Sequence, residues 1–149
     1  MSGGDLFVAN YSDGRIGEYT TNGVAVNASL VSGLNFPFGI AVSGGDIFVA
    51  NSQGTTIGEY TTNGVTVNAS LVSGLGQPIG VAVFGGDLFV TDVGFNRIGE
   101  YTTSGATVNV SLVSGLTDLY GIAVVPEPSV LALAAFGGLS LLLLRRQRS

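Results

Sequence analysis

The side chains that could do chemistry in this chain are carboxylates, hydroxyls and phenols, because the sequence contains neither histidine nor cysteine. Histidine is the commonest general base, and cysteine supplies thiolate metal ligands. Six acidic residues recur at a spacing of 41 residues, either after Gly-Gly or after a single glycine: Asp5, Asp46, Asp87, Glu18, Glu59 and Glu100. A catalytic group is seldom copied into every repeat, so we expect these acids to bond turn backbones or to face solvent.

A third recurring position is polar and directly follows an apolar run, and it is occupied by Asn10, Asn51 and Asp92. Because this position ends a predicted strand, the three side chains could line one end of the molecule. It is also an ordinary turn position, and we favour that role. Three tyrosines recur on another predicted strand, where we expect packing rather than a ligand platform: Tyr19, Tyr60 and Tyr101.

The charge distribution excludes a nucleic-acid-binding protein. Up to Val125 the chain carries nine carboxylates against Arg15 and Arg97, whereas nucleic-acid phosphates require a cationic partner. The glycine-rich segments are predicted turns, and none of them opens a helix that could bind phosphate. The residues by themselves therefore predict no metal site and no cofactor.

The elements that position these residues repeat with a fixed period. The first two units are identical at 29 of 41 positions without an insertion, which indicates one structural unit per repeat. Each unit predicts four strands, which in the first unit are residues 6–9, 15–20, 24–31 and 39–42. Asn-Gly or Ser-Gly supplies the turn before the third strand. The predicted fold is all-β, with three repeats at residues 3–43, 44–84 and 85–125.

Four strands in roughly 40–45 residues are typical of a β-propeller blade. The residues resemble NHL-type repeats, best in the third unit, where residues 90–92 and 96–98 are similar to that family's Val-x-Asp and Asn-Arg-Ile. Residues 37–42 and 78–83 are similar to its Pro-x-Gly-Ile-Ala-Val strand, although Leu119 replaces the proline in the third unit. Lactonase-type propellers bind a divalent metal through axial Glu, Asn and Asp residues. The resemblance therefore leaves a lactonase-like hydrolase as an alternative, with Asn10, Asn51 and Asp92 as candidates.

Three blades are fewer than the four to eight of a closed propeller. The chain begins at the second strand of a blade, and residues 121–124 are a spare first strand that could complete the first blade. Either two chains assemble a six-bladed ring, or the sequence belongs to a longer protein. We favour the longer protein.

Residues 125–149 differ sharply in composition from the repeats. Residues 130–144 are uncharged and apolar, and a basic cluster of Arg145, Arg146 and Arg148 follows. As a helix the apolar run is somewhat short of the ~30 Å hydrocarbon core, but flanking residues and snorkelling arginines would let it span. The basic cluster would then lie in the cytoplasm and the repeats outside. The residues predicted to mark this transmembrane helix are Val130, Leu131, Phe136, Gly137, Gly138, Leu141 and Leu144.

This segment resembles the PEP-CTERM sorting domain. The resemblance rests on Pro126-Glu127-Pro128, on the apolar helix with its internal Gly-Gly, and on the terminal arginines. It implies recognition of Pro126, Glu127 and Pro128 by exosortase, a membrane cysteine protease, and removal of the tail, much as a temporary GPI signal is removed. It also implies a Gram-negative bacterium that makes extracellular polysaccharide. A plain single-span anchor is the alternative.

Export also needs an N-terminal signal, and residues 1–30 have no basic region and no long apolar stretch. We therefore expect the natural start to lie upstream, with a signal peptide and further repeats.

Together these features predict an exported protein of the cell envelope or extracellular matrix that is held transiently in the inner membrane. Its propeller would bind polysaccharide or a surface protein without catalysis. A lactonase-like metal-dependent hydrolase and a plain membrane-anchored repeat protein are the alternatives.

Overall fold

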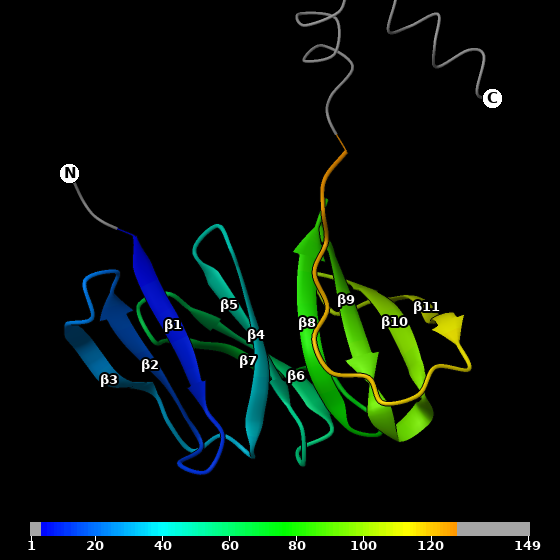
Figure 1. Ribbon diagram of the computed structural model, residues 1–149, viewed down its shortest axis with the longest axis horizontal. Helices are drawn as coiled ribbons and strands as arrows, with labels where there is room; N and C mark the ends of the chain where they lie inside the picture. Colours follow the sequence, from blue (N-terminus) through cyan, green and yellow to red (C-terminus); the bar gives the residue numbers. More distant parts are fainter. Residues whose placement is uncertain (1–3, 128–149) are drawn as a thin grey trace, which may run out of the picture.

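The computed structural model describes residues 4–127, which form three antiparallel β-sheets (Figure 1). The first sheet contains β1 (Asp5–Asn10), β2 (Arg15–Thr20) and β3 (Ala25–Val31). The second contains β4 (Pro37–Ser43), β5 (Asp46–Asn51), β6 (Thr56–Thr61) and β7 (Thr66–Val72). The third contains β8 (Pro78–Phe84), β9 (Asp87–Asp92), β10 (Arg97–Thr102) and β11 (Thr107–Ser114), with a short 3-10 helix, η1 (Val93–Phe95), between β9 and β10. The all-β prediction is confirmed for these residues.

Each sheet is a meander in which strands that follow one another in the chain are paired side by side. The turns between the last two strands of each sheet have the predicted chemistry. Gly23, Gly64 and Gly105 have φ angles of 84°, 86° and 91°, which glycine adopts without the steric cost that other residues carry. The amide of Gly23 donates to the carbonyl of Thr20 at 2.9 Å, and the other two turns repeat this bond.

The strand that follows Gly-Gly in the second repeat, β5, is buried on both faces because a sheet lies on each side of it. In β5, Ile47 and Val49 pack toward the first sheet, while Phe48 and Ala50 pack toward the third. Successive side chains of a strand point to opposite faces, so a strand buried on both sides reads as a continuous apolar run.

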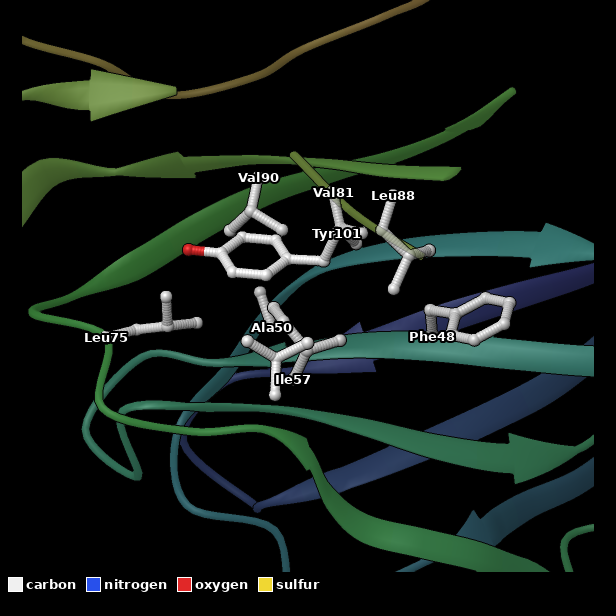
Figure 2. Close-up of a cluster of buried hydrophobic side chains, with 9 residues drawn as sticks. Phe48, Ala50, Ile57, Leu75, Val81, Leu88, Val90 and Tyr101 are labelled. Atoms are coloured by element: carbon white, nitrogen blue, oxygen red, sulfur yellow. The ribbon is translucent and has the colours of Figure 1, made fainter. Parts of the chain in front are cut away.

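The two contacts between neighbouring sheets use the same residue positions displaced by 41. The buried core between the first and second sheets consists of Ile16, Val31, Ile47, Val49 and Tyr60. The corresponding residues between the second and third sheets are Ile57, Val72, Leu88, Val90 and Tyr101, joined by Phe48, Ala50, Leu75 and Val81. Figure 2 shows this second core, in which the ring of Tyr101 faces Ala50 and Ile57.

The first sheet has three strands, whereas the second and third have four, as predicted for a chain that begins at the second strand of a blade. No strand of the described chain pairs with the outer edge of β1, so that edge lacks an innermost strand. The fourth strand of each sequence repeat instead begins the next sheet, as β4 and β8 do.

The prediction of a strand at residues 121–124 is wrong, because these residues form no strand in the structure. This segment runs beside β8 (Figure 1), where the side chain of Thr91 donates to the carbonyl of Tyr120 at 2.9 Å. It has the sequence of an innermost strand, but no ladder partner is present for it among residues 4–127. A strand needs such a partner for its backbone hydrogen bonds.

The predicted transmembrane helix at residues 130–144, the predicted sorting residue Pro128 and the basic cluster of Arg145, Arg146 and Arg148 lie outside the described residues. Among residues 4–127, no helix has the length and apolarity needed to cross a bilayer. Pro126 and Glu127 are exposed and belong to no strand or helix.

Candidate functional site

The turns β1–β2, β5–β6 and β9–β10 gather at one end of the molecule with the linkers that enter β4 and β8. We call this end the mouth; it lies at the lower edge of Figure 1. Register places the linkers there, because Pro37 pairs with Asn51 and Pro78 pairs with Asp92. All three predicted mouth positions therefore lie at one end.

A cavity of about 270 Å³ lies between the innermost segments of the three repeats. Its lining comes from three positions of each repeat: Phe38, Ile79 and Tyr120; Gly39, Gly80 and Gly121; Ile40, Val81 and Ile122. This arrangement identifies it as the axial cavity of a propeller-like array, bordered by β4, β8 and the segment that follows β11.

Glycine is required where these segments approach each other. A β-carbon on Gly39 would collide with the carbonyl oxygen of Ile79, and one on Gly80 would lie 2.7 Å from the carbonyl oxygen of Tyr120. Real β-carbons do not approach backbone oxygen so closely, so the two glycines let the inner strands converge on the axis.

Asp92 is buried, and its carboxylate binds the backbone of the linker before β8. One oxygen, Oδ1, accepts hydrogen bonds from the amides of Gly76 and Gln77 at 3.1 and 2.8 Å, and Oδ2 accepts from Gly76 at 3.0 Å. The guanidinium of Arg97 lies 3.8 Å from Oδ2. These contacts fix the linker, and Asp92 is not among the residues that line the cavity.

Asn51 occupies the equivalent position in the second repeat and is also buried. Its amide nitrogen donates to the hydroxyl of Thr56 at 3.4 Å, whereas its side-chain oxygen has no partner. The phenol of Tyr60 is nearby: burial raises its pKa, and the Asn51 side chain acts in the opposite direction. Asn10, in the first repeat, is half-buried beside Tyr11, Ser12 and Asp13.

The recurring acids do not form a catalytic set. Glu18, Glu59 and Glu100 lie on β2, β6 and β10, one in each sheet. Burial raises the pKa of the Glu59 carboxyl, and the Asp46 carboxylate raises it further. Nowhere in residues 4–127 do three His, Cys, Asp or Glu side chains gather in a way that could hold a metal ion.

Two of the three recurring tyrosines pack between sheets as predicted, whereas Tyr19 on β2 is half-buried and belongs to neither core. Tyr60 and Tyr101 are buried in the two cores. Each ring lies over the glycine two residues earlier in its strand. A β-carbon on Gly58 or Gly99 would lie only 2.7 Å from the tyrosine hydroxyl oxygen. The repeated Gly-Glu-Tyr thus provides space for a ring that folds back along its own strand.

The mouth contains an aromatic cluster that the repeat pattern did not predict. Tyr11 packs against Phe36 and Phe38, with ring centroids 4.9 and 5.8 Å apart. Tyr11 and Phe38 are exposed, and Phe38 borders the axial cavity together with the exposed Tyr120.

A signal for this cluster was present in the differences between repeats. Of the 12 positions that differ between the first two units, eight are residues 11–15, 35, 36 and 38. All eight lie at the mouth, in the β1–β2 turn and around the start of β4. The strands, and the turns at the end of the molecule opposite the mouth, have nearly the same residues in both repeats.

No protein-family model matches the sequence, and no curated protein sequence matches it. Solved structures share its fold, among them the following three. A streptogramin B lyase has a TM-score of 0.65 and 22% identity, with 80% of this chain and 41% of the lyase covered. A chain of a nidogen–laminin complex has a TM-score of 0.65 and 22% identity, with coverage of 82% and 49%. A catalytically inactive histidine-to-alanine variant of virginiamycin B lyase from Staphylococcus aureus, with quinupristin, has a TM-score of 0.57 and 24% identity, with coverage of 76% and 40%.

The chain thus spans less than half the length of the structures that it resembles. At these identities the likeness concerns the fold alone. Residues 4–127 have the architecture of part of a six-bladed β-propeller.

Proposed function

We propose that this chain is an exported, non-catalytic binding protein whose mouth binds a neutral surface polysaccharide. The observation that carries the proposal is the concentration of repeat differences at the mouth, where they create the aromatic cluster of the exposed Tyr11 and Phe38 and the half-buried Phe36. A structural end of the blade would have remained as uniform as the strands. Exposed aromatic rings are suited to stacking on the apolar faces of sugars.

The charge of the chain favours a neutral ligand. The ten carboxylates all precede Pro128, and only Arg15 and Arg97 oppose them there. An anionic polysaccharide would be repelled by this surface at low salt.

Affinity electrophoresis of the full chain in mild detergent tests the proposal, with dextran and pullulan as neutral probes and xanthan as an anionic one. We expect retardation by a neutral probe. The double variant Tyr11→Ala with Phe38→Ala should weaken binding about tenfold or more, since each aromatic contact contributes ~0.5–1.5 kcal/mol. Phe84→Ala is the matched control, because Phe84 is equally exposed but lies at the opposite end of β8. Equal binding by the double variant would contradict the proposal.

A metal-dependent hydrolase has less support. The Asp92 carboxylate is engaged by backbone amides and Arg97, and Asn10, Asn51 and Asp92 occupy different environments.

We further propose that exosortase processes the chain at Pro126-Glu127-Pro128. The exposure of Pro126 and Glu127 supports access by a protease. Intact mass of the exported product, from a host with exosortase and from one lacking it, tests this step. Loss of the tail only in the first host is expected, and Pro126→Ala with Glu127→Ala should prevent it, whereas Glu18→Gln should not. An intact tail in both hosts would instead favour a plain membrane anchor.

A further inference from the structure

The two outer faces of the three-sheet array are complementary halves of one contact. Each contact between neighbouring sheets has two halves. The sheet that comes first in the chain contributes Ile16 and Val31 or their equivalents, which we call the earlier half, and the next sheet contributes Ile47 and Val49 or their equivalents, which we call the later half. The outer face of the first sheet carries the later half, with Leu6 and Val8 at the positions of Ile47 and Val49. The outer face of the third sheet carries the earlier half, with Ile98 and Val113 at the positions of Ile16 and Val31.

Exposure shows that these positions lack a neighbour. Leu6 and Val8 are 47% and 41% exposed, whereas Ile47, Val49, Leu88 and Val90 are fully buried. Val113 is 41% exposed, whereas Val31 and Val72 are 6% and 4% exposed.

The outermost strands, which we call the rim, contain a valine position that is exposed in all three sheets. It provides the comparison between ordinary surface and a face that lacks a neighbouring sheet. Val26, Val67 and Val108 occupy one position of the outermost strands and are 56%, 53% and 52% exposed. Their exposure does not depend on whether a sheet lies next to them, so this position faces solvent. Only positions that are buried inside the array become exposed at its ends.

The glycine contacts reveal the same incomplete junction. Gly64 lies against the carbonyl oxygen of Leu30 in the preceding sheet, and Gly105 lies against that of Leu71. A β-carbon placed on either glycine would be 2.5 Å from the oxygen. The equivalent Gly23 has nothing within 4 Å, and Leu112 occupies the position of Leu30 and Leu71 on the last strand of the third sheet.

A second set of glycine contacts follows the axis. Gly39 approaches the inner strand of the next sheet, and Gly80 approaches the segment after β11. Gly121 occupies the next equivalent position and has nothing within 4 Å. The inner edge of β1 has no paired strand among the described residues, and residues 121–124 have the sequence of an inner strand without a ladder.

We propose that two copies of this chain close a six-bladed ring through these faces. The third sheet of each copy packs on the first sheet of the other, and residues 121–124 add to β1 of the partner copy as its fourth strand. Each sheet then has two neighbours, and the exposed edge of β1 is paired. A two-fold axis relates the two junctions.

A second copy fits these faces because its own outer faces are the two halves of the same contact, and it has the size that the ring requires. The chain covers 41% and 49% of two propellers that it resembles, so two copies supply about one complete ring. The internal contacts also define the register of the added strand. Val42 pairs with Ile47 and Val83 pairs with Leu88, which places Val124 opposite Leu6 of the other copy. Further repeats in a longer polypeptide would meet the same faces, and the experiment separates the two cases.

Light scattering coupled to size exclusion, on the full chain in a mild detergent, tests the assembly. The wild type should be a dimer. Val8→Glu places a charge on the outer face, and Gly121→Val fills space that is open in a single chain but faces the partner's backbone in the ring. Both variants should be monomers with unchanged far-UV circular dichroism. Val67→Glu, at the solvent-facing rim, should remain a dimer.

Cysteine pairing tests the register, because the chain contains no native cysteine. Leu6→Cys combined with Val124→Cys should form a disulfide-linked dimer with oxidised glutathione. Leu6→Cys combined with Ala123→Cys should not, because adjacent side chains of a strand point to opposite faces.

Each other outcome overturns the proposal. A monomeric wild type would leave the faces for repeats outside this chain. Open oligomers larger than two would contradict ring closure. A dimer that persists in both Val8→Glu and Gly121→Val would be held elsewhere, for example by the apolar residues 130–144. Polysaccharide binding is measured separately, so its failure would leave this assembly unaffected.

Discussion

Asp92, Asn51 and Asn10 show how one sequence position acquires different roles at the residue scale. Asp92 binds two backbone amides of the linker before β8 and lies near Arg97. Asn51 is buried with an unpaired side-chain oxygen, and Asn10 is partly open to solvent. The shared position predicted a shared place at the mouth, but the partners of each side chain decide what it does.

The Asp92 contacts predict a stability effect. Asp92→Ala should lower the free energy of unfolding by about 2–4 kcal/mol, because two linker amides lose a charged acceptor inside the protein. Urea denaturation followed by circular dichroism measures the change. Asn10→Ala at the equivalent position should cost less than about 1 kcal/mol. Equal costs for the two variants would show that Asp92 does not hold the linker.

The buried tyrosines predict a loss of stability at alkaline pH. Burial raises the pKa of Tyr60 and of Tyr101, and at Tyr101 the charge of Arg97 partly opposes this effect. The folded protein therefore keeps these protons to higher pH than the unfolded chain. Their contribution is complete below the unfolded pKa of about 10 and is lost as the pH rises through the folded values.

Urea denaturation between about pH 8 and pH 11 checks this sign. The free energy of unfolding should fall with pH in the wild type. The fall should be smaller in Tyr60→Phe with Tyr101→Phe, whereas Tyr120→Phe, at an exposed site, should leave it unchanged. A wild-type stability that rises over this range would contradict the assignment.

At the scale of elements, the inner strands depend on glycine where they converge. Gly39→Ala should lower the free energy of unfolding by about 1–3 kcal/mol, because the new methyl group meets the backbone carbonyl of Ile79, which cannot rotate away. Gly45→Ala, in the open turn between β4 and β5, has nothing within 4 Å and should change stability by less than about 0.5 kcal/mol. Thermal denaturation of the two variants gives the comparison. A neutral Gly39→Ala would mean that β4 and β8 can separate without cost.

At the scale of the whole molecule, burial is graded across the three sheets. The second sheet has a neighbour on each face, whereas the first and third sheets each have one. Hydrogen exchange on the Val8→Glu variant, which we expect to be monomeric, should therefore be slowest in β5 and β6 and fastest in β1 and β11. In the wild-type ring β1 should gain protection. Uniform protection across the sheets of the variant would contradict this graded stability.

Most strands and turns of this protein follow from the local sequence alone. Residues 15–20 form β2 as predicted, the four-strand pattern of residues 37–72 is present in the second sheet, and Gly23, Gly64 and Gly105 form the predicted turns. These features depend on alternation of apolar side chains and on local backbone angles, which neighbouring residues control.

Only the tertiary structure decided which elements have partners and which side chains meet. Residues 121–124 carry the same inner-strand pattern as β4, yet they form no ladder, because strand formation requires a second edge that the sequence pattern does not contain. Tyr11 and Phe38 are 27 positions apart in the chain, and only the packing of the first two sheets brings their rings together. Periodicity is local and was readable, whereas the edges, faces and mouth arise from contacts between distant residues.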